Sequence, residues 1–195
     1  MKTTKKITYF DNQGPKNTKN CVDIAIERAT ELGLKTIVVA SSSGTTAQEF
    51  FRKISIKNIH LVILTHAFGF SSPDVWDFDA TLADKLRSSG HRIVCGIHAL
   101  SGLERALSRA PRIGGGSRTE AIVESFRRTL SVGLKVAVEC VLIAADQGAI
   151  SLNTEVVAVG GTENGADTVL VIKPANTASF FDLQVREIVA MPGNR

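Results

Sequence analysis

The sequence predicts an α/β fold of three layers, with a mostly parallel sheet, helices on both faces and a mixed edge. Two observations predict it. Apolar runs of strand type alternate with amphipathic helical segments through much of the chain, which is typical of a parallel sheet whose strands are buried on both faces. Toward the C-terminus, strand-like runs follow one another with fewer helices between them, and this change indicates a mixed edge.

The first half of the chain supplies the alternating pattern. Its apolar runs predict strands at residues 6–10, 35–40, 58–64 and 91–97. Apolar residues at helical spacing predict helices between them, at residues 17–32, 46–55 and 74–89. Two of these helices end at a glycine, at Gly33 and Gly90. Capping boxes, in which a Ser or Thr precedes a Glu by three residues, pair Thr46 with Glu49, Ser101 with Glu104, and Ser117 with Glu120.

The second half begins with helices and ends with strands. Helices are predicted at 101–109, before Pro111, and at 120–130, after a glycine turn at 114–116. A third helix at 132–147 is apolar almost all round, with Lys135 and Glu139 as its narrow polar stripe, so it should be buried. The last strands are predicted at residues 155–159, 168–172 and 185–191.

Length and composition indicate one domain over residues 1–195. The chain is 44% hydrophobic and 22% charged, which is ordinary for a globular protein with a full core. Its net charge of +4 comes from scattered Lys and Arg residues without interleaved aromatic residues, so no nucleic-acid partner is expected. A mild positive charge suits an anionic small ligand.

Targeting signals and cysteine usage indicate a cytoplasmic protein. No apolar run approaches the ~20 residues of a membrane span, and the N-terminus lacks the apolar core of a signal peptide. The three cysteines, Cys21, Cys95 and Cys140, lie far apart and are odd in number. They indicate reduced thiols rather than a disulfide framework or a metal site. Neither a membrane nor a metal is therefore expected. The helix at 132–147 suits either the core, which we favour, or a homo-oligomer.

Residues 36–49, TIVVASSSGTTAQE, carry the strongest indication of a ligand site. A strand ends at a Ser/Gly turn, and a helix starts directly after it. The unpaired N–H groups and the dipole at such a helix start bind phosphate or another anion without a lysine. The alternative is that the serines and the glycine only form the turn and cap the helix. The residues assigned to this site are Ser41, Ser43, Gly44, Thr45, Thr46 and Ala47.

Other candidate residues follow the remaining strands. Right-handed crossovers bring the turns after these strands to one edge of the sheet, where ligands of open α/β sheets bind. The residues added there are His66, His98, Gly161, Thr162 and Asp167. Each has an alternative: the histidines can tie loops to backbone carbonyls, and Asp167 can form the turn before the last hairpin. Phe68 and Phe70, in the loop after His66, can either cover a flat ring or fill the core.

Common catalytic motifs are absent from the sequence. It has no GxSxG nucleophile elbow, no GxGxxG dinucleotide loop and no GxxxxGK[ST] phosphate loop. Catalytic residues therefore stay unassigned, and the usual nicotinamide and ATP chemistries lose their support. One possibility is a hydrolase or transferase of a phosphate ester, with His66 or His98 as general acid or base.

The run VVASSSGTTAQEF resembles the phosphate-loop signature of the pyruvate kinase C-terminal α/β domain, in which this loop holds a phosphate of the sugar bisphosphate effector. The positions that match the signature are Ser41, Ser43, Gly44, Thr45 and Thr46. Nearly the whole chain is also similar to a small stand-alone family, mainly archaeal, described as pyruvate kinase α/β-domain-like. The matching pieces are ITYFDNQG, VVASSSGTTA, THAFGF, HALSGLERA, VAVECVLIAADQGAI, VAVGGTENGADTVLVIKPA and VREIVAMPG.

The resemblance implies a pyruvate kinase C-terminal domain-like fold and an FMN-type flavin as the ligand, with its phosphate on the Ser/Gly loop. It implies no established reaction. The pyruvate kinase barrel and its catalytic residues are missing from this sequence, which excludes phosphoenolpyruvate chemistry. We therefore expect an FMN-binding protein and, if it turns over a substrate, a flavin-dependent oxidoreductase. The alternative is a non-catalytic binding or regulatory module for a phosphorylated metabolite such as a sugar phosphate.

Overall fold

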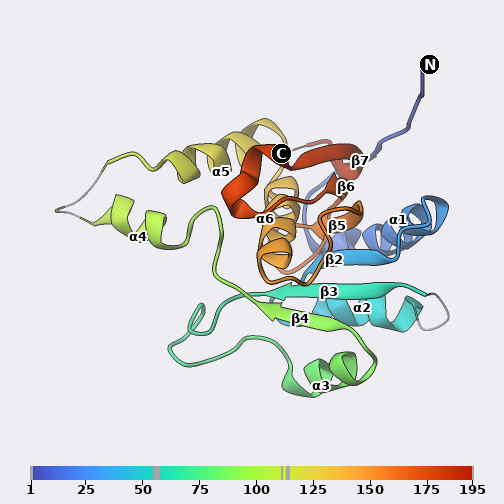
Figure 1. Ribbon diagram of the computed structural model, residues 1–195, viewed down its shortest axis with the longest axis horizontal. Helices are drawn as coiled ribbons and strands as arrows, with labels where there is room; N and C mark the ends of the chain where they lie inside the picture. Colours follow the sequence, from blue (N-terminus) through green and yellow to red (C-terminus); the bar gives the residue numbers. More distant parts are fainter. Residues whose placement is uncertain (1, 55–57, 111, 113–114, 195) are drawn as a thin grey trace.

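A sheet of seven strands forms the centre of the molecule (Figure 1), counted over residues 2–54, 58–110, 112 and 115–194, which the computed structural model describes. The strands lie in the order β1-β7-β6-β5-β2-β3-β4. Their bounds are Thr8–Phe10 (β1), Thr36–Ala40 (β2), His60–Thr65 (β3), Arg92–Cys95 (β4), Val156–Gly160 (β5), Thr168–Lys173 (β6) and Gln184–Pro192 (β7). Strand β6 runs antiparallel to β5 and β7, whereas the other pairs are parallel. This confirms the expected fold class, with the mixed part at one end of the sheet.

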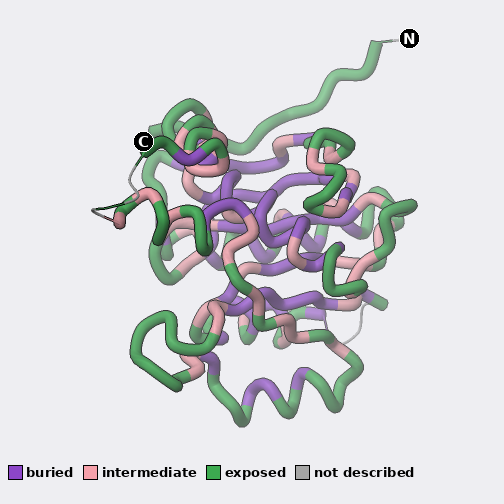
Figure 2. Tube along the Cα trace, turned by 60° about the vertical axis from the view of Figure 1, so that its left-hand side comes forward, coloured by how far each residue is buried: buried purple, intermediate pink, exposed green. Residues whose placement is uncertain are grey.

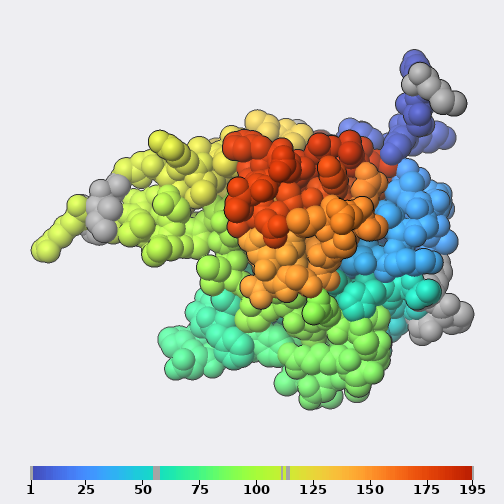
Figure 3. All heavy atoms as spheres, in the orientation of Figure 1, coloured from blue at the N-terminus to red at the C-terminus, as the bar shows by residue number. Residues whose placement is uncertain are grey.

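Helices cover both faces of the sheet. Their bounds are Thr18–Glu31 (α1), Thr45–Ile54 (α2), Ala80–Ser88 (α3), Gly102–Arg109 (α4), Arg118–Thr129 (α5) and Val132–Asp146 (α6), with short 3-10 turns at Pro15–Asn17 (η1) and Thr177–Asp182 (η2). Helices α1, α2 and α3 pack on one face, and α6 packs on the other. Helices α4 and α5 extend from the body as an arm, seen on the left of Figures 1 and 3.

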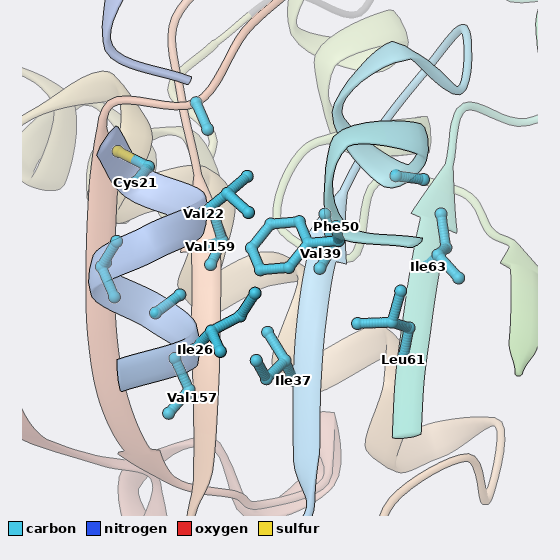
Figure 4. Close-up of a cluster of buried hydrophobic side chains, with 14 of the residues drawn as sticks. Cys21, Val22, Ile26, Ile37, Val39, Phe50, Leu61, Ile63, Val157 and Val159 are labelled. Carbon is cyan, nitrogen blue, oxygen red and sulfur yellow. The ribbon is translucent and has the colours of Figure 1, made fainter. Parts of the chain in front are cut away.

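The central strands are buried on both faces, because successive side chains of a strand point to opposite sides. On one side, Ile37 and Val39 of β2 contact the cluster that contains Val22 of α1 and Phe50 of α2 (Figure 4). On the other side, Val38 joins the cluster around α6. Each of these side chains is fully buried, and full burial of one such side chain contributes about 1.5–3 kcal/mol. Figure 2 shows the resulting interior, with buried strands and exposed connecting loops.

Helix α3 starts later than the sequence pattern predicts, at Ala80 instead of residue 74. Its N-cap is Asp79, whose Oδ1 accepts a hydrogen bond from the Leu82 N–H at 2.7 Å. The segment before it is used for aromatic packing, because Trp76 stacks on Phe78 with ring centroids 5.3 Å apart. The loop after β3 is therefore longer than expected, and it lies beside the carboxyl ends of the strands.

Two of the expected capping boxes are wrong. Thr46 lies inside α2, which begins at Thr45, and Ser101 precedes α4 without a side-chain capping bond. At α5, Ser117 Oγ does accept the Glu120 N–H, at 3.2 Å. Three positions named in the sequence analysis lie outside the described residues: Ser55, Pro111 and Gly114.

The described helices include none that combines the length and the apolar character needed to cross a membrane.

Helix α6 approaches the sheet closely through two glycines. A Cβ atom on Gly160 of β5 would overlap the backbone of α6 at Gly133 and Ala137, and one on Gly133 would overlap the side chains of Asp167 and Thr168. Because glycine has no side chain, α6 can lie close to β5. This short distance also fixes where the α6 residues lie at the carboxyl edge of the sheet.

We predict that Gly133→Ala destabilises the protein by about 1–3 kcal/mol, because overpacking outweighs the gain in helix propensity. The control is Gly102→Ala at the start of α4, where a Cβ would have no neighbour within 4 Å. Urea unfolding followed by circular dichroism measures both variants. Equal stability of the two variants would contradict the close contact described here.

Candidate functional site

The chain changes direction between two neighbouring strands of the sheet. From β2 it proceeds through α2 to β3, whereas β5, the other neighbour of β2, is reached through α6 on the opposite face. Ligands of open α/β sheets bind at such a switch point, outside the carboxyl ends of the strands. A cavity of about 120 Å³ opens there.

Four segments and two helices line this cavity. They are the end of β2 with the loop after it (Ala40, Ser41, Ser42, Ser43), the end of β3 with the residue after it (Leu64, Thr65, His66), the loop after β4 (Gly96, His98), the loop after β5 (Gly161, Glu163, Asn164, Gly165), the first turn of α2 (Thr46) and helix α6 (Val136, Glu139, Cys140, Ile143). The carboxyl ends of β2, β3, β4 and β5 therefore meet as the sequence predicts.

The loop after β2 leaves amide groups free at the start of α2. The buried Ser41 Oγ accepts the Ala47 N–H at 3.2 Å, so Ser41 caps the helix in place of the expected Thr46–Glu49 pair. In the described part of the chain, no acceptor is bonded to the amides of Thr45 and Thr46. These two N–H groups, at the positive end of a ten-residue helix, suit an anion such as phosphate.

A buried carboxylate forms the other side of the cavity. Glu139 of α6 is 2% exposed and accepts three hydrogen bonds: from His98 Nδ1 at 3.0 Å, the Leu100 N–H at 3.0 Å and Lys135 Nζ at 2.5 Å. Lys135 is itself buried. Both oxygens of the ionised carboxylate therefore accept hydrogen bonds, as a buried charge requires.

Burial by itself raises the pKa of Glu139, but the bond to His98 and the charge of Lys135 outweigh burial and bring this pKa to about 2. Glu139 is therefore ionised at neutral pH. Its charge orients the imidazole of His98 through a hydrogen bond at Nδ1. The other ring nitrogen, Nε2, takes no part in this bond.

His66 lies on the opposite wall from α6, at the end of β3. Its ring centroid is 5.8 Å from that of His98 and 3.8 Å from that of Phe70. His66 Nδ1 is buried without a hydrogen-bond partner among the described residues, and the nearest carboxylate oxygen, on Asp77, is 3.7 Å away. Burial, followed by the charge of His98, lowers the pKa of His66, so its imidazole is neutral at pH 7.

Residues 19–172 match the family model of the pyruvate kinase alpha/beta domain. This span is more than half of the chain and contains every residue that lines the cavity. The chain belongs to the pyruvate kinase α/β domain family. The expected fold resemblance is confirmed by this match, and the cavity lies in the matched part of the domain.

In this pyruvate kinase α/β domain, six of the predicted site residues line the cavity: Ser41, Ser43, Thr46, His66, His98 and Gly161. The other five do not line it, and their ligand roles stay predictions: Gly44, Thr45, Ala47, Thr162 and Asp167. Gly44 has φ of 101°, and a Cβ atom there would meet Leu82 and Phe78, so the sharp turn before α2 requires glycine.

Asp167 is fully buried and has a structural set of partners. Its Oδ2 accepts the Gly14 N–H at 2.9 Å and the Thr162 N–H at 3.2 Å, and its Oδ1 accepts the Thr168 hydroxyl at 2.8 Å. These bonds fix the glycine loop after β5. Thr162 Oγ1, in the same loop, is buried without a partner in the described part of the chain.

Helix α6 supplies site residues that the sequence analysis places in the core. Glu139 is named there only as part of a polar stripe on a buried helix, and the signal for its role is its spacing of four residues from Lys135 in an otherwise apolar helix. Cys140 also lines the cavity, but burial and the charge of Glu139 raise its pKa to about 12. A thiol is nucleophilic as the thiolate, so Cys140 is not an activated nucleophile.

We predict that the stability supplied by Glu139 is lost in acid. Its pKa is lower in the folded than in the unfolded protein, so this contribution is complete above pH about 4.5 and falls as the pH drops toward about 2. Glu139→Gln should cost about 3 kcal/mol near pH 7, with a smaller difference from wild type at pH 3.

The control is Glu49→Gln, which removes a surface ion pair with Arg52 and should cost less than about 1 kcal/mol. Urea unfolding at a series of pH values measures both variants. Wild-type and Glu139→Gln curves that run parallel through the acid range would contradict the prediction.

Proposed function

We propose that this pyruvate kinase α/β domain binds a phosphorylated small molecule at the switch point, and that the molecule is FMN. The observation that carries the proposal is the start of α2, where the amides of Thr45 and Thr46 have no acceptor in the described part of the chain and Thr46 lines a cavity walled by hydroxyl and glycine loops. Backbone amides at a helix start bind a phosphate dianion with charge-assisted hydrogen bonds.

The loop after β3 supports a ring system as the rest of the ligand. Phe70 is 53% exposed and its ring lies beside His66 on the cavity wall, whereas Phe68, 64% exposed, stacks on Trp76 in the same loop. A cavity of about 120 Å³ takes a phosphate and a short chain, so a flat ring would extend past it onto these aromatic side chains. Exposed aromatic faces of this kind stack well on planar rings.

A polar atom without a partner among the described residues fits the same ligand. His66 lines the cavity, and its Nδ1 can bond to a hydroxyl group of a ribityl chain. A bound flavin supplies hydride and electron transfer, whereas the protein supplies binding and orientation. The activity that we propose with FMN is therefore an oxidoreduction.

A second candidate is a non-catalytic binding or regulatory module for a phosphorylated metabolite such as a sugar phosphate. The small size of the cavity favours it, because a phosphate with a short carbon chain would be enclosed almost completely. Both candidates use the same phosphate site. They differ in the part of the ligand attached to the phosphate, which is a ribityl chain with a flavin ring in one case and a short carbon chain in the other.

We predict that FMN raises the melting temperature of the protein and that the fluorescence of FMN is quenched on binding. Riboflavin, which lacks the phosphate, should bind at least about tenfold more weakly. The visible absorption spectrum of the purified protein provides a first check for bound flavin. A sugar bisphosphate that stabilises the protein while FMN does not would support the second candidate. Equal binding of FMN and riboflavin would contradict the phosphate site.

We further predict that Thr45→Pro weakens FMN binding by about 10- to 100-fold. Thr45 is the first residue of α2, where proline is tolerated but removes the N–H group, and one charge-assisted hydrogen bond is worth about 1.5–3 kcal/mol. Thr45→Ala is the matched control, since it removes the hydroxyl and retains the amide. Equal affinity of the two variants, measured by fluorescence titration, would place the phosphate elsewhere.

A further inference from the structure

Two histidines that line the cavity each lie near a carboxylate. His98 Nδ1 is 3.0 Å from Glu139 Oε2, and His66 Nδ1 is 3.7 Å from Asp77 Oδ2. The two ring centroids are 5.8 Å apart. The other two histidines of the chain, His60 and His91, lie at the opposite edge of the sheet, where β3 and β4 begin.

The two imidazoles differ in their surroundings. Glu139 is held by Lys135 and the Leu100 N–H, so its charge is fixed next to His98 and can balance the imidazolium that forms when His98 takes up a proton. His66 has a buried Nδ1 without a partner among the described residues, and burial lowers its pKa, which favours the neutral imidazole, a ring that can donate one N–H. Paired groups in contrasting surroundings are typical of a general base and its electrophilic partner.

The charges in the cavity favour proton transfer over phosphoryl transfer. Stabilising a transferring phosphoryl group takes cations at its oxygens, but no Lys or Arg of the described residues lines the cavity. Lys135 forms an ion pair with Glu139 and does not line the cavity. Cys140 is not an activated nucleophile, as shown above. Two imidazoles near an anion site remain, and proton transfer at carbon needs only a base and a donor to the carbonyl oxygen.

We propose that His98 and His66 enolise a short phosphorylated hydroxy-carbonyl compound whose phosphate lies on the first turn of α2. His98 Nε2 removes a proton from the carbon next to the carbonyl, and the electron pair of that C–H bond forms the C=C bond of the enolate. The charge moves to the carbonyl oxygen, which accepts a hydrogen bond from the His66 ring N–H. Return of the proton from His98 to the same carbon restores the substrate. Return to the neighbouring carbon, with the hydroxyl proton passing through the His66 ring to the former carbonyl oxygen, gives the isomer, so no oxidant or further reactant is consumed.

Glu139 and Lys135 act as positioning residues in this step, because they touch His98 or its carboxylate rather than the substrate. The inference rests on the phosphate site of the proposed function, but not on FMN. It names a second class of ligand for that site, with which FMN would compete.

Deuterium exchange tests the inference. The full chain is incubated in D2O with dihydroxyacetone phosphate, and proton NMR follows loss of the C–H signal next to the carbonyl. Wild type should exchange this proton faster than a protein-free sample, dihydroxyacetone without phosphate should exchange at the background rate, and inorganic phosphate or FMN should slow the reaction.

The decisive variant is His98→Asn, whose side-chain amide can still donate to Glu139 but lacks the Nε2 base. It should lose at least about 100-fold in exchange rate with little change in melting temperature, and His66→Asn should behave similarly. His60→Asn, at the other edge of the sheet, should keep the wild-type rate. Because all variants are purified alike, equal exchange by wild type and His98→Asn would reveal a contaminating isomerase and overturn the inference.

The outcome separates this inference from the proposed function. No exchange by wild type above background, with FMN bound as measured by fluorescence, would overturn the inference and leave the FMN proposal standing. Phosphate-dependent exchange that needs His98, in a protein that FMN neither stabilises nor inhibits, would support the inference and reject FMN as the ligand.

Discussion

The structure depends on the topological switch point between strands β2 and β5. These neighbours are parallel, but the helix after β2 lies on one face of the sheet and the helix before β5 lies on the other. The connecting loops cannot close over the space at the carboxyl ends, so a cavity remains there without any sacrifice of core packing. Thr46 at the start of α2 and Glu139 of α6 both line this space because the two helices lie on opposite faces of the sheet.

Helix α6 combines two requirements that oppose each other. It packs against the sheet through glycine and apolar residues, yet it carries Lys135 and Glu139 into the interior. Such a pair is costly unless every charge is bonded, and here the third partner is His98 on a loop. The loop after β4 is therefore held in one position by a buried charge.

Much of the fold follows from local patterns. The strand runs, the glycine stops and the Ser/Gly turn before α2 are short-range signals, and the predicted meeting of four strand ends is confirmed. The start of α3 is missed, because Trp76 and Phe78 fit a helical pattern but pack on each other in a loop. The capping of α2 is also missed, because Ser41 reaches the Ala47 amide over six residues, which exceeds the spacing of a capping box.

The site is harder to predict, because side-chain direction depends on distant contacts. Asp167 and Glu139 are both acidic residues, but Asp167 bonds to Gly14, which is 153 residues away in the sequence, while Glu139 faces the cavity. No local pattern distinguishes them. A charged pair at helical spacing inside an apolar helix is the one sequence feature that marks Glu139.

The bond between Gly14 and Asp167 has a practical consequence for anyone who trims this protein. The family match begins at residue 19, but Gly14 lies before that boundary and donates to a carboxylate with no exposure to solvent. A truncated protein that begins at residue 19 would lack both β1 and the Gly14 donor. The edge of β7 would then be exposed, and the glycine loop after β5 would lose one of its hydrogen bonds. The short segment before the matched residues is thus a structural part of the sheet and of the loop after β5.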